Sequence, residues 1–195
     1  AGIPLAAPSA NPFGYVSPTT AEHVRTNLGN RIHYILDGGA SRIGLESTII
    51  DARDTNHLRL LRPGAITPKQ IETTLGLTVK PVKSRATSEA QVAPGMLAQH
   101  YSPRAKVILH DRLAAAAAGE SRHEARLHFA KPSGKLTQHD YWLGLNGDQQ
   151  GAAQKLFAQL RMLDGKGYHI IHAERAPEGP YATAINDRLG RAAAK

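Results

Sequence analysis

The chain has 195 residues, a net charge of +8 with histidines neutral, and no cysteine. Its hydrophobic content of 41% is typical of a globular protein with a buried core and argues against wholesale disorder. No apolar run approaches the roughly 20 residues that span a bilayer, so we expect no membrane partner. The lack of cysteine excludes disulfides and thiolate metal sites, and it fits a reducing cytoplasm, where we expect the protein to reside.

The excess of positive charge indicates either a basic surface of no special role or an anionic partner such as a nucleotide, a phosphate or RNA. Half of the excess falls in residues 80–106, where five Lys or Arg stand against one acidic residue. We infer a weak RNA contact through this segment as one hypothesis. A solvated, charged linker is the alternative.

Residues 1–79 are expected to form a first domain, in which short strands alternate with turns and two helices. The first helix is predicted to begin at Thr19, whose spacing to Glu22 is that of a capping box, and to end at Gly29. Strands are predicted over residues 32–36, 47–51 and 58–61.

The second predicted helix of this domain has signals at both ends. Thr67 is expected to cap it together with Gln70. Ile71 and Leu75 are predicted to form its buried face, and Gly76 is predicted to end it.

Residues 80–104 show no hydrophobic periodicity and are predicted to be a linker, which at this length is uncommon inside a compact unit unless it is functional or disordered. Residues 105–195 alternate strands with helices, which predicts a second domain with a small parallel α/β sheet. The predicted strands are 106–110, 125–129, 141–143 and 168–172, and the predicted helices are 114–118, 149–164 and 181–194. The helix 149–164 has the clearest apolar stripe, formed by Ala153, Leu156, Phe157, Leu160 and Leu163.

Several common kinds of site are not predicted. The sequence has no Gly-x4-Gly-Lys-Ser/Thr run and no Gly-x-Gly-x-x-Gly run after a strand, so neither phosphate loop is expected. The closest histidine pair, His169 and His172, lies three residues apart in a predicted strand, where the two side chains point to opposite faces. We therefore predict no metal site built by the protein itself.

Small polar residues gather in two early stretches. Pro8-Ser9-Ala10-Asn11 places a hydroxyl and an amide among small residues, which allows a ligand to approach the backbone. Ser17-Pro18-Thr19 lies at a predicted helix start, where free N–H groups and the helix dipole favour anions. Each stretch taken alone is also compatible with ordinary turn and cap chemistry.

Three later stretches carry similar signals. Residues 44–48, Gly-Leu-Glu-Ser-Thr, lead into a strand, and the glycine indicates a close backbone approach at the rim of a sheet. Arg62 stands at a strand end before a Pro-Gly pair, where its planar fork of donors suits a phosphate, with a surface ion pair as the alternative. In the linker, the aromatic residues His100 and Tyr101 could stack on a base or close a pocket.

The order and spacing of these motifs resemble one family. Across essentially its whole length, the chain resembles the long, two-domain form of the YrdC-type threonylcarbamoyl-AMP synthases. Further stretches that carry the resemblance are Asp37-Gly38-Gly39, Arg62-Pro63-Gly64, His100-Tyr101-Ser102-Pro103 and Ala184-Ile185-Asn186-Asp187-Arg188-Leu189. The resemblance implies an α/β fold: an incomplete YrdC-type domain, a linker that folds over the active site, and a small parallel, Rossmann-like domain.

The resemblance also implies a reaction and its site. Members of the family join L-threonine, bicarbonate and ATP into threonylcarbamoyl-adenylate and release pyrophosphate, with Mg²⁺ expected mainly on the phosphates. Partner proteins then transfer the threonylcarbamoyl group to tRNA. The implied ATP-binding residues are Ser9, Asn11, Ser17, Arg62 and Tyr101, and the implied L-threonine-binding residues are Ala7 and Ser47. No catalytic residue is assigned. Glu46 and His100 are expected to lie around the site, behind the residues that contact the substrates.

The sequence departs from the family pattern at its start. The family has a substantial portion before the Pro-Ser-Ala-Asn loop, with a lysine/arginine motif, whereas this chain opens on the apolar run Ala-Gly-Ile-Pro-Leu. We therefore expect this chain to be the C-terminal part of such an enzyme and to be inactive on its own. Turnover in a pyrophosphate-release assay would contradict this expectation. The alternative hypothesis is a non-catalytic nucleotide- or RNA-binding module that uses the basic linker and the second domain.

Overall fold

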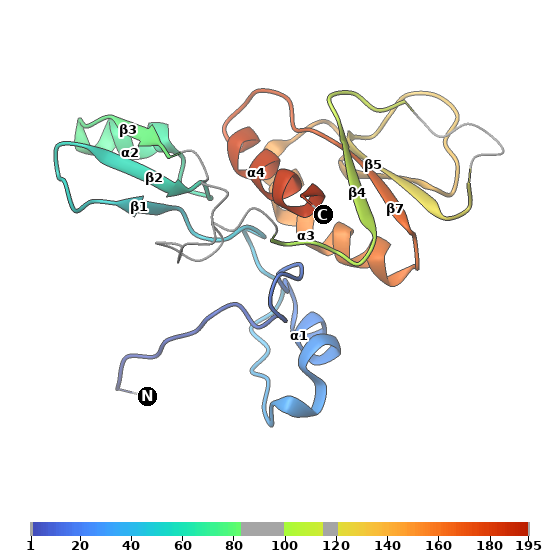
Figure 1. Cartoon of the computed structure of the whole chain (residues 1–195), viewed down its shortest axis with the longest axis horizontal. Helices are drawn as coiled ribbons and strands as arrows, with labels where there is room; N and C mark the ends of the chain where they lie inside the picture. The colour runs from blue at the N-terminus through green and yellow to red at the C-terminus, as the bar shows by residue number, and fades with distance from the viewer. Residues whose placement is uncertain (1, 83–99, 115–120, 195) are drawn as a thin grey trace.

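The computed structural model describes residues 2–82, 100–114 and 121–194. In Figure 1 these residues form three neighbouring groups: an N-terminal segment with helix α1, a small sheet with helix α2, and a larger sheet with helices α3 and α4. The predicted α/β class is confirmed. Among the helices of these ranges, none combines the length and the apolar character that crossing a membrane requires.

Helix α1 spans Ala21–Leu28. Its N-cap is Thr20, whose side chain accepts a hydrogen bond from the His23 N–H, so the predicted capping box of Thr19 with Glu22 is wrong by one residue. Thr19 is buried instead, and its hydroxyl lies 3.2 Å from Nδ1 of His23. The Thr19 carbonyl accepts a hydrogen bond of 2.8 Å from the Ser41 N–H, a contact outside the helix, and the helix begins one residue later.

The strand predicted over residues 32–36 is wrong. After a 3₁₀ turn over Gly29–Arg31, this segment runs as irregular chain. Tyr34 and Leu36 are 94% and 99% exposed. A strand is stabilised by ladder hydrogen bonds to a neighbour, and no strand of the described ranges pairs with this segment. A short, largely apolar run by itself therefore did not produce a strand here.

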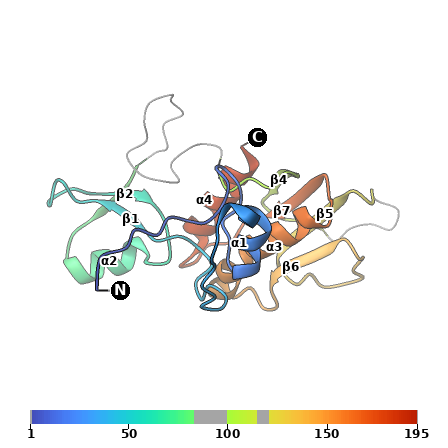
Figure 2. The same ribbon diagram turned by 90° about the horizontal axis from the view of Figure 1, so that it is seen from below.

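The small sheet has the order β1-β2-β3. Its strands are β1 (Ile49–Asp51), β2 (Leu58–Arg62) and β3 (Val79–Pro81), of which β3 was not predicted. Strand β2 pairs antiparallel with β1 and parallel with β3. Leu58, Leu60 and Val79 form a small core of their own. Figure 2 shows this sheet and α2 to one side of the larger sheet.

Helix α2 (Pro68–Leu75) connects β2 to β3, and its capping box of Thr67 with Gln70 is confirmed. Gly76 ends the helix in the left-handed region, at φ +67°. Ile71 packs against the small core, but Leu75 is 55% exposed, so its predicted burial is wrong. A helix of two turns on a three-stranded sheet buries a narrower stripe than its apolar pattern suggests.

The larger sheet contains four parallel strands in the order β4-β7-β5-β6. The strands are β4 (Lys106–His110), β5 (Glu124–Ala130), β6 (Asp140–Gly144) and β7 (Ile170–Glu174). The predicted parallel sheet is confirmed, although the last strand begins two residues later than predicted. The predicted helix over 114–118 falls, apart from its first residue, outside the described residues. Most of the predicted linker, residues 83–99, also lies outside them, so the predicted domain boundaries stay predictions.

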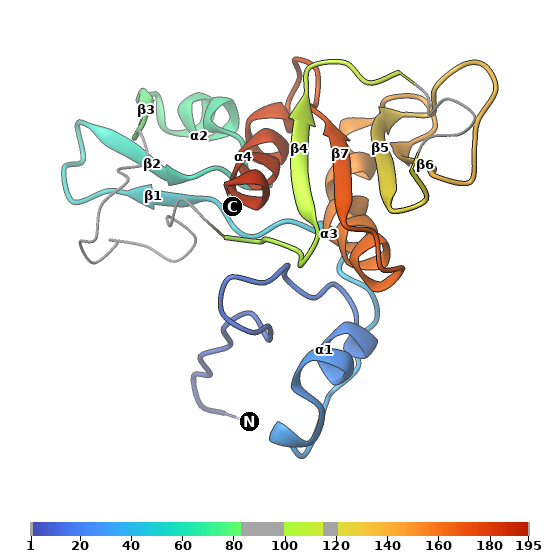
Figure 3. The same cartoon turned by 45° about the vertical axis from the view of Figure 1, so that its right-hand side comes forward.

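Helices α3 (Gln149–Gly165) and α4 (Ala182–Ala193) pack with this sheet, and Figure 3 shows α3 behind it and α4 beside β4. All five residues of the predicted apolar stripe on α3 are buried. They share one core with Ile185 and Leu189 of α4, which are 0% exposed, and with inward residues of the strands. Burial of about 25 cal/mol per Å² of apolar surface makes this cluster the main source of stability in the described structure.

The N-terminal loop is docked on the C-terminal end of α3. Val16 belongs to the same core, and its carbonyl accepts a hydrogen bond of 2.8 Å from Nη1 of Arg161. The Tyr15 hydroxyl donates to Asp164 Oδ2 at 2.8 Å. Burial and Asp164 raise the pKa of Tyr15 to about 12, so the hydroxyl remains a donor at neutral pH. The loop that carries the predicted site is thus held by helix α3 of the larger sheet.

Three side chains of the larger sheet, those of His110, His172 and Glu124, form a hydrogen-bonded chain that makes the stability of the fold depend on pH. His110 Nε2 lies 2.9 Å from His172 Nδ1, and His172 Nε2 lies 3.0 Å from Glu124 Oε2. Burial lowers the pKa of His110, and His172 and Arg126 lower it further. A folded-state pKa below the unfolded value of about 6.5 means that the unfolded chain binds more protons in acid.

We therefore expect the free energy of unfolding to fall as the pH drops from about 6.5 through the folded-state pKa of His110. His110→Gln should reduce this pH dependence. It should not abolish it, because burial also lowers the pKa of His23 and His100. Urea unfolding between pH 5 and 8 measures the effect, with His33→Gln, an exposed histidine outside the sheet, as the control. Equal pH profiles for the wild-type chain and His110→Gln would contradict the prediction.

Candidate functional site

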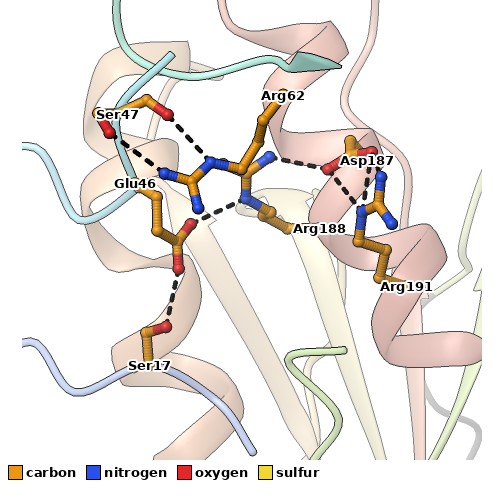
Figure 4. Close-up of polar contacts among 7 residues, drawn as sticks. All are labelled: Ser17, Glu46, Ser47, Arg62, Asp187, Arg188 and Arg191. Carbon is orange, nitrogen blue, oxygen red and sulfur yellow. Dashed lines mark hydrogen bonds and ion pairs between the residues drawn. The ribbon is translucent and has the colours of Figure 1, made fainter. Parts of the chain in front are cut away.

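The site is centred on one carboxylate, Glu46, which two distant residues hold from opposite sides (Figure 4). Ser17 Oγ donates a hydrogen bond to Oε1 of Glu46 at 2.7 Å. Nε of Arg188, on α4, donates to Oε2 at 2.9 Å. Both carboxylate oxygens are therefore occupied, which fixes the orientation of Glu46.

Arg188 is 0% exposed and stands in a small network of charges on α4. Its Nη1 donates to Asp187 Oδ2 at 2.8 Å, and Asp187 Oδ1 also pairs with Nη2 of Arg191 at 2.9 Å. Burial opposes the charge of Arg188, but Glu46 and Asp187 contribute to raising the pKa of its guanidinium above the ordinary value. A buried charge of this kind is tolerated because its partners stay in place.

Arg62 lies at the end of β2 and binds the segment that carries Glu46. Its Nε donates to the Ser47 carbonyl at 3.1 Å, and its Nη2 donates to Ser47 Oγ at 3.1 Å. Arg62 is 8% exposed, so the alternative of a surface ion pair does not describe it. The structure thus brings the predicted residues Ser17, Ser47 and Arg62 together around Glu46.

Two glycines allow the segment 44–48 to lie against its neighbours. Gly44 has a φ of +74°, and a Cβ there would lie 2.3 Å from the Gln154 carbonyl oxygen on α3. A Cβ on Gly64, which follows β2, would lie 2.4 Å from the Thr48 amide nitrogen. The predicted close backbone approach at Gly44 is confirmed, and its neighbour is the backbone of a helix.

Tyr101 lies behind this cluster with its side chain in the core. It is 1% exposed and has a φ of +58°, an uncommon conformation for a residue other than glycine. Its ring stacks on Phe157 with centroids 5.3 Å apart, and the Arg188 guanidinium lies 5.3 Å from the ring centroid. Burial, and then Glu46, raise the pKa of the Tyr101 hydroxyl. His100 contacts the same ring edge-on, at 4.1 Å between centroids.

A cavity of about 130 Å³ opens beside Glu46. Its lining is Ser9, Ser17, Pro18, Thr19, Ser41, Gly44, Leu45, Glu46 and Phe157. Larger cavities of about 460 and 480 Å³ lie near the C-terminal end of α3, but their linings contain none of the predicted site residues. We therefore place the candidate site at the smaller cavity, whose lining includes the predicted ATP-binding serines Ser9 and Ser17 together with the fixed carboxylate.

Two predicted residues lie apart from this cluster. The Asn11 amide donates to the carbonyls of Pro12 and Tyr15, both at 3.0 Å, so its NH₂ group shapes the loop. Ala7 is exposed in the extended N-terminal segment and is not part of the cavity lining. For Ala7 and Asn11, the structure adds no contact to the roles that the resemblance implies.

Arg188 and Asp187 were not predicted as site residues. One sequence signal could have found Arg188, since it falls on the apolar stripe of α4 between Ile185 and Leu189. A charged residue at a buried helical position needs a partner. The sequence alone gives no way to identify that partner, which lies 142 residues away.

Comparison with known proteins gives a family for both parts of the chain. Residues 66–194 match the family model described as "Threonylcarbamoyl-AMP synthase, C-terminal domain", and residues 1–64 match the Sua5/YciO/YrdC model described as "Telomere recombination". The chain therefore belongs to the threonylcarbamoyl-AMP synthase family.

Individual relatives agree with this assignment. The threonylcarbamoyl-AMP synthase of Pyrococcus abyssi is 34% identical over 198 residues, which cover 97% of this chain and 57% of the relative. That of Bacillus subtilis is 35% identical over 201 residues, covering 98% of this chain and 58% of the relative. The crystal structure of P. abyssi Sua5 complexed with L-threonine matches with a TM-score of 0.78 at 30% identity, covering 95% of this chain and 56% of that one. The chain thus spans little more than half the length of these relatives.

Proposed function

We propose that this chain is part of an L-threonylcarbamoyladenylate synthase. In this reaction L-threonine, bicarbonate and ATP form threonylcarbamoyl-AMP and pyrophosphate. The proposal is carried by the meeting of Ser17, Ser47 and Arg62 around Glu46, in a chain of this family whose fold resembles that of a threonine-bound member. The threonylcarbamoyl group is proposed to pass to a downstream tRNA-modifying complex in the cytoplasm.

For ATP, we propose contacts from Ser9 and Ser17 at the cavity and from Arg62, which binds the neighbouring Ser47. Because the Ser17 proton is donated to Glu46, Ser17 is proposed to accept a hydrogen bond from a ribose hydroxyl or the adenine amine. Adenylyl transfer requires donors that stabilise charge on the phosphates, and the planar fork of Arg62 suits that task. Asn11 remains a proposed ATP contact on the resemblance alone, because its NH₂ group is engaged in the loop and its Oδ1 is buried. A direct contact from Tyr101 requires its ring to leave Phe157.

For L-threonine, we propose Ser47 and Ala7 as contacts. Ser47 is exposed, and its hydroxyl accepts a hydrogen bond from Nη2 of Arg62. Arg62 therefore connects the proposed L-threonine contact with the proposed ATP contacts. Ala7 is proposed on the resemblance alone. The small side chain of Ala7 leaves room for the methyl group of the substrate.

Mg²⁺ is proposed to enter on the ATP phosphates, where it would neutralise charge during adenylyl transfer. The residues suit this arrangement rather than a cation site of their own, because both oxygens of Glu46 are already engaged by Ser17 and Arg188. Within the described ranges, no group of three or more His, Cys, Asp or Glu side chains could hold a metal ion.

Titration calorimetry with ATP and L-threonine tests this proposal. The chain is expected to bind both, and L-serine, which lacks the methyl group, should bind more weakly than L-threonine. Binding of ATP or RNA without any binding of L-threonine would favour the alternative, a non-catalytic nucleotide- or RNA-binding module. Pyrophosphate release that requires ATP, L-threonine and bicarbonate together would establish the reaction, and it would contradict the expectation that this chain is inactive on its own.

Arg62→Ala is expected to weaken ATP binding by about 1–3 kcal/mol, because it removes a charge-assisted donor. The matched control is Arg59→Ala on the same strand, since Arg59 is half-exposed and pairs with Asp51 instead. Calorimetric titration of both variants with ATP measures the difference. Equal affinities for the two variants would remove Arg62 from the proposed site.

A further inference from the structure

The contact between Ser17 and Arg188, made through Glu46, joins three segments that are far apart in the sequence. Ser17 lies before α1, Glu46 lies before β1, and Arg188 lies on the last helix, α4. The helix that carries Arg188 is anchored in the core of the larger sheet through Ile185 and Leu189. Through Arg188, the helix α4 thus contacts the carboxylate of the proposed nucleotide pocket.

The geometry leaves little freedom to the residues in this contact. Asp187 and Glu46 hold the Arg188 guanidinium at two different nitrogens, and the residue is 0% exposed. Glu46 cannot rotate without giving up either the guanidinium or the Ser17 hydroxyl. Because Ser17 donates its proton to Glu46, the remaining lone pairs of the hydroxyl point away from the carboxylate.

We propose that Arg188 is a positioning residue for the nucleotide pocket, which acts through Glu46 to hold the Ser17 hydroxyl at the cavity. This inference rests on the proposed function, and it gives the C-terminal domain a role beyond stability. Without Arg188, Glu46 loses its fixed orientation and Ser17 rotates among its rotamers. Nucleotide binding must then fix the Ser17 side chain in one rotamer, and the conformational entropy lost in doing so lowers the affinity for the nucleotide.

The test is equilibrium binding of a fluorescent ATP analogue to the whole chain. Ser17→Ala and Arg188→Met are each expected to weaken binding about tenfold, the equivalent of about 1.4 kcal/mol. The double variant should be no more than about twofold weaker than either single variant, because both changes remove the same interaction. Arg188→Lys, which keeps the charge, should restore part of the affinity.

Arg191→Met is the matched control, since Arg191 lies on the same helix and pairs with Asp187 rather than with Glu46. It should bind the analogue within about twofold of the wild-type chain. Circular dichroism checks the folding of each variant. If Arg188→Met does not fold, Glu46→Gln replaces it in the cycle, because the amide keeps only one of the two oxygens that accept from Ser17 and Arg188.

The outcomes separate this inference from the proposed function. Binding losses that multiply to about a hundredfold in the double variant would overturn the positioning role. Equal losses for Arg188→Met and Arg191→Met would also overturn it, because they would indicate general destabilisation of α4. A wild-type chain that binds no nucleotide would overturn the proposed function, and this inference with it.

Discussion

Replacing Phe157 by alanine is expected to lower the free energy of unfolding by about 3–5 kcal/mol. Phe157 is 1% exposed on α3 and belongs to the main core. Its ring stacks on Tyr101 on one side, and it also lines the cavity beside Glu46. Removal of the ring therefore takes apolar contacts from the core and leaves a void that the neighbouring helices can fill only in part.

Urea unfolding measures the effect, with Leu145→Ala as the control, because Leu145 is 65% exposed. The control should change the free energy of unfolding by less than about 0.5 kcal/mol. Nucleotide binding by Phe157→Ala should fall as well, since Phe157 lines the cavity beside Glu46. A loss of stability no larger than that of the control would mean that the core does not depend on this ring.

The second large effect is expected from Gly44→Ala, at about 2–5 kcal/mol. The added Cβ would lie 2.3 Å from the carbonyl oxygen of Gln154, an atom of the α3 backbone that cannot move aside as a side chain can. The positive φ of +74° adds conformational strain for any residue with a Cβ. The segment that carries Glu46 and Ser47 should therefore separate from α3.

A matched variant separates the two causes. Gly39 also has a positive φ, +84°, but a Cβ there would meet nothing within 4 Å. Gly39→Ala should cost no more than about 1–2 kcal/mol, from backbone strain alone. Unfolding in urea and ATP binding should both be measured, and Gly44→Ala should lose more in each. Equal losses would show that contact with α3 contributes nothing.

Local patterns in the sequence predicted those elements whose signals are also local. The five apolar residues of the stripe on 149–164 repeat at helical spacing, and all are buried in α3. The capping box of Thr67 with Gln70 needs residues three apart, and it is present. The strand 106–110 has its predicted bounds. For the two helices, the residues that signal the element lie within a few turns of chain, whereas the strand also depends on pairing with the distant β7.

The failed predictions share a dependence on distant partners. The segment 32–36 is a short, largely apolar run typical of a strand, but no strand of the described ranges pairs with it, so Tyr34 and Leu36 stay exposed. Thr19 was expected to cap α1, but it is buried, its carbonyl accepts from the N–H of the distant Ser41, and Thr20 caps the helix. Leu75 falls on the apolar face of α2, yet the small sheet is too narrow to cover it.

By itself, the sequence determined the α/β class, the parallel second sheet, the main helices and the family, because periodicity, caps and motif order are written along the chain. The tertiary structure alone decided that Glu46 lies between Ser17 and Arg188, and that Arg62 holds Ser47. These contacts join residues 15 to 142 positions apart. A buried charge shows in the sequence that a partner must exist, but the docking of helices and sheets determines which residue it is.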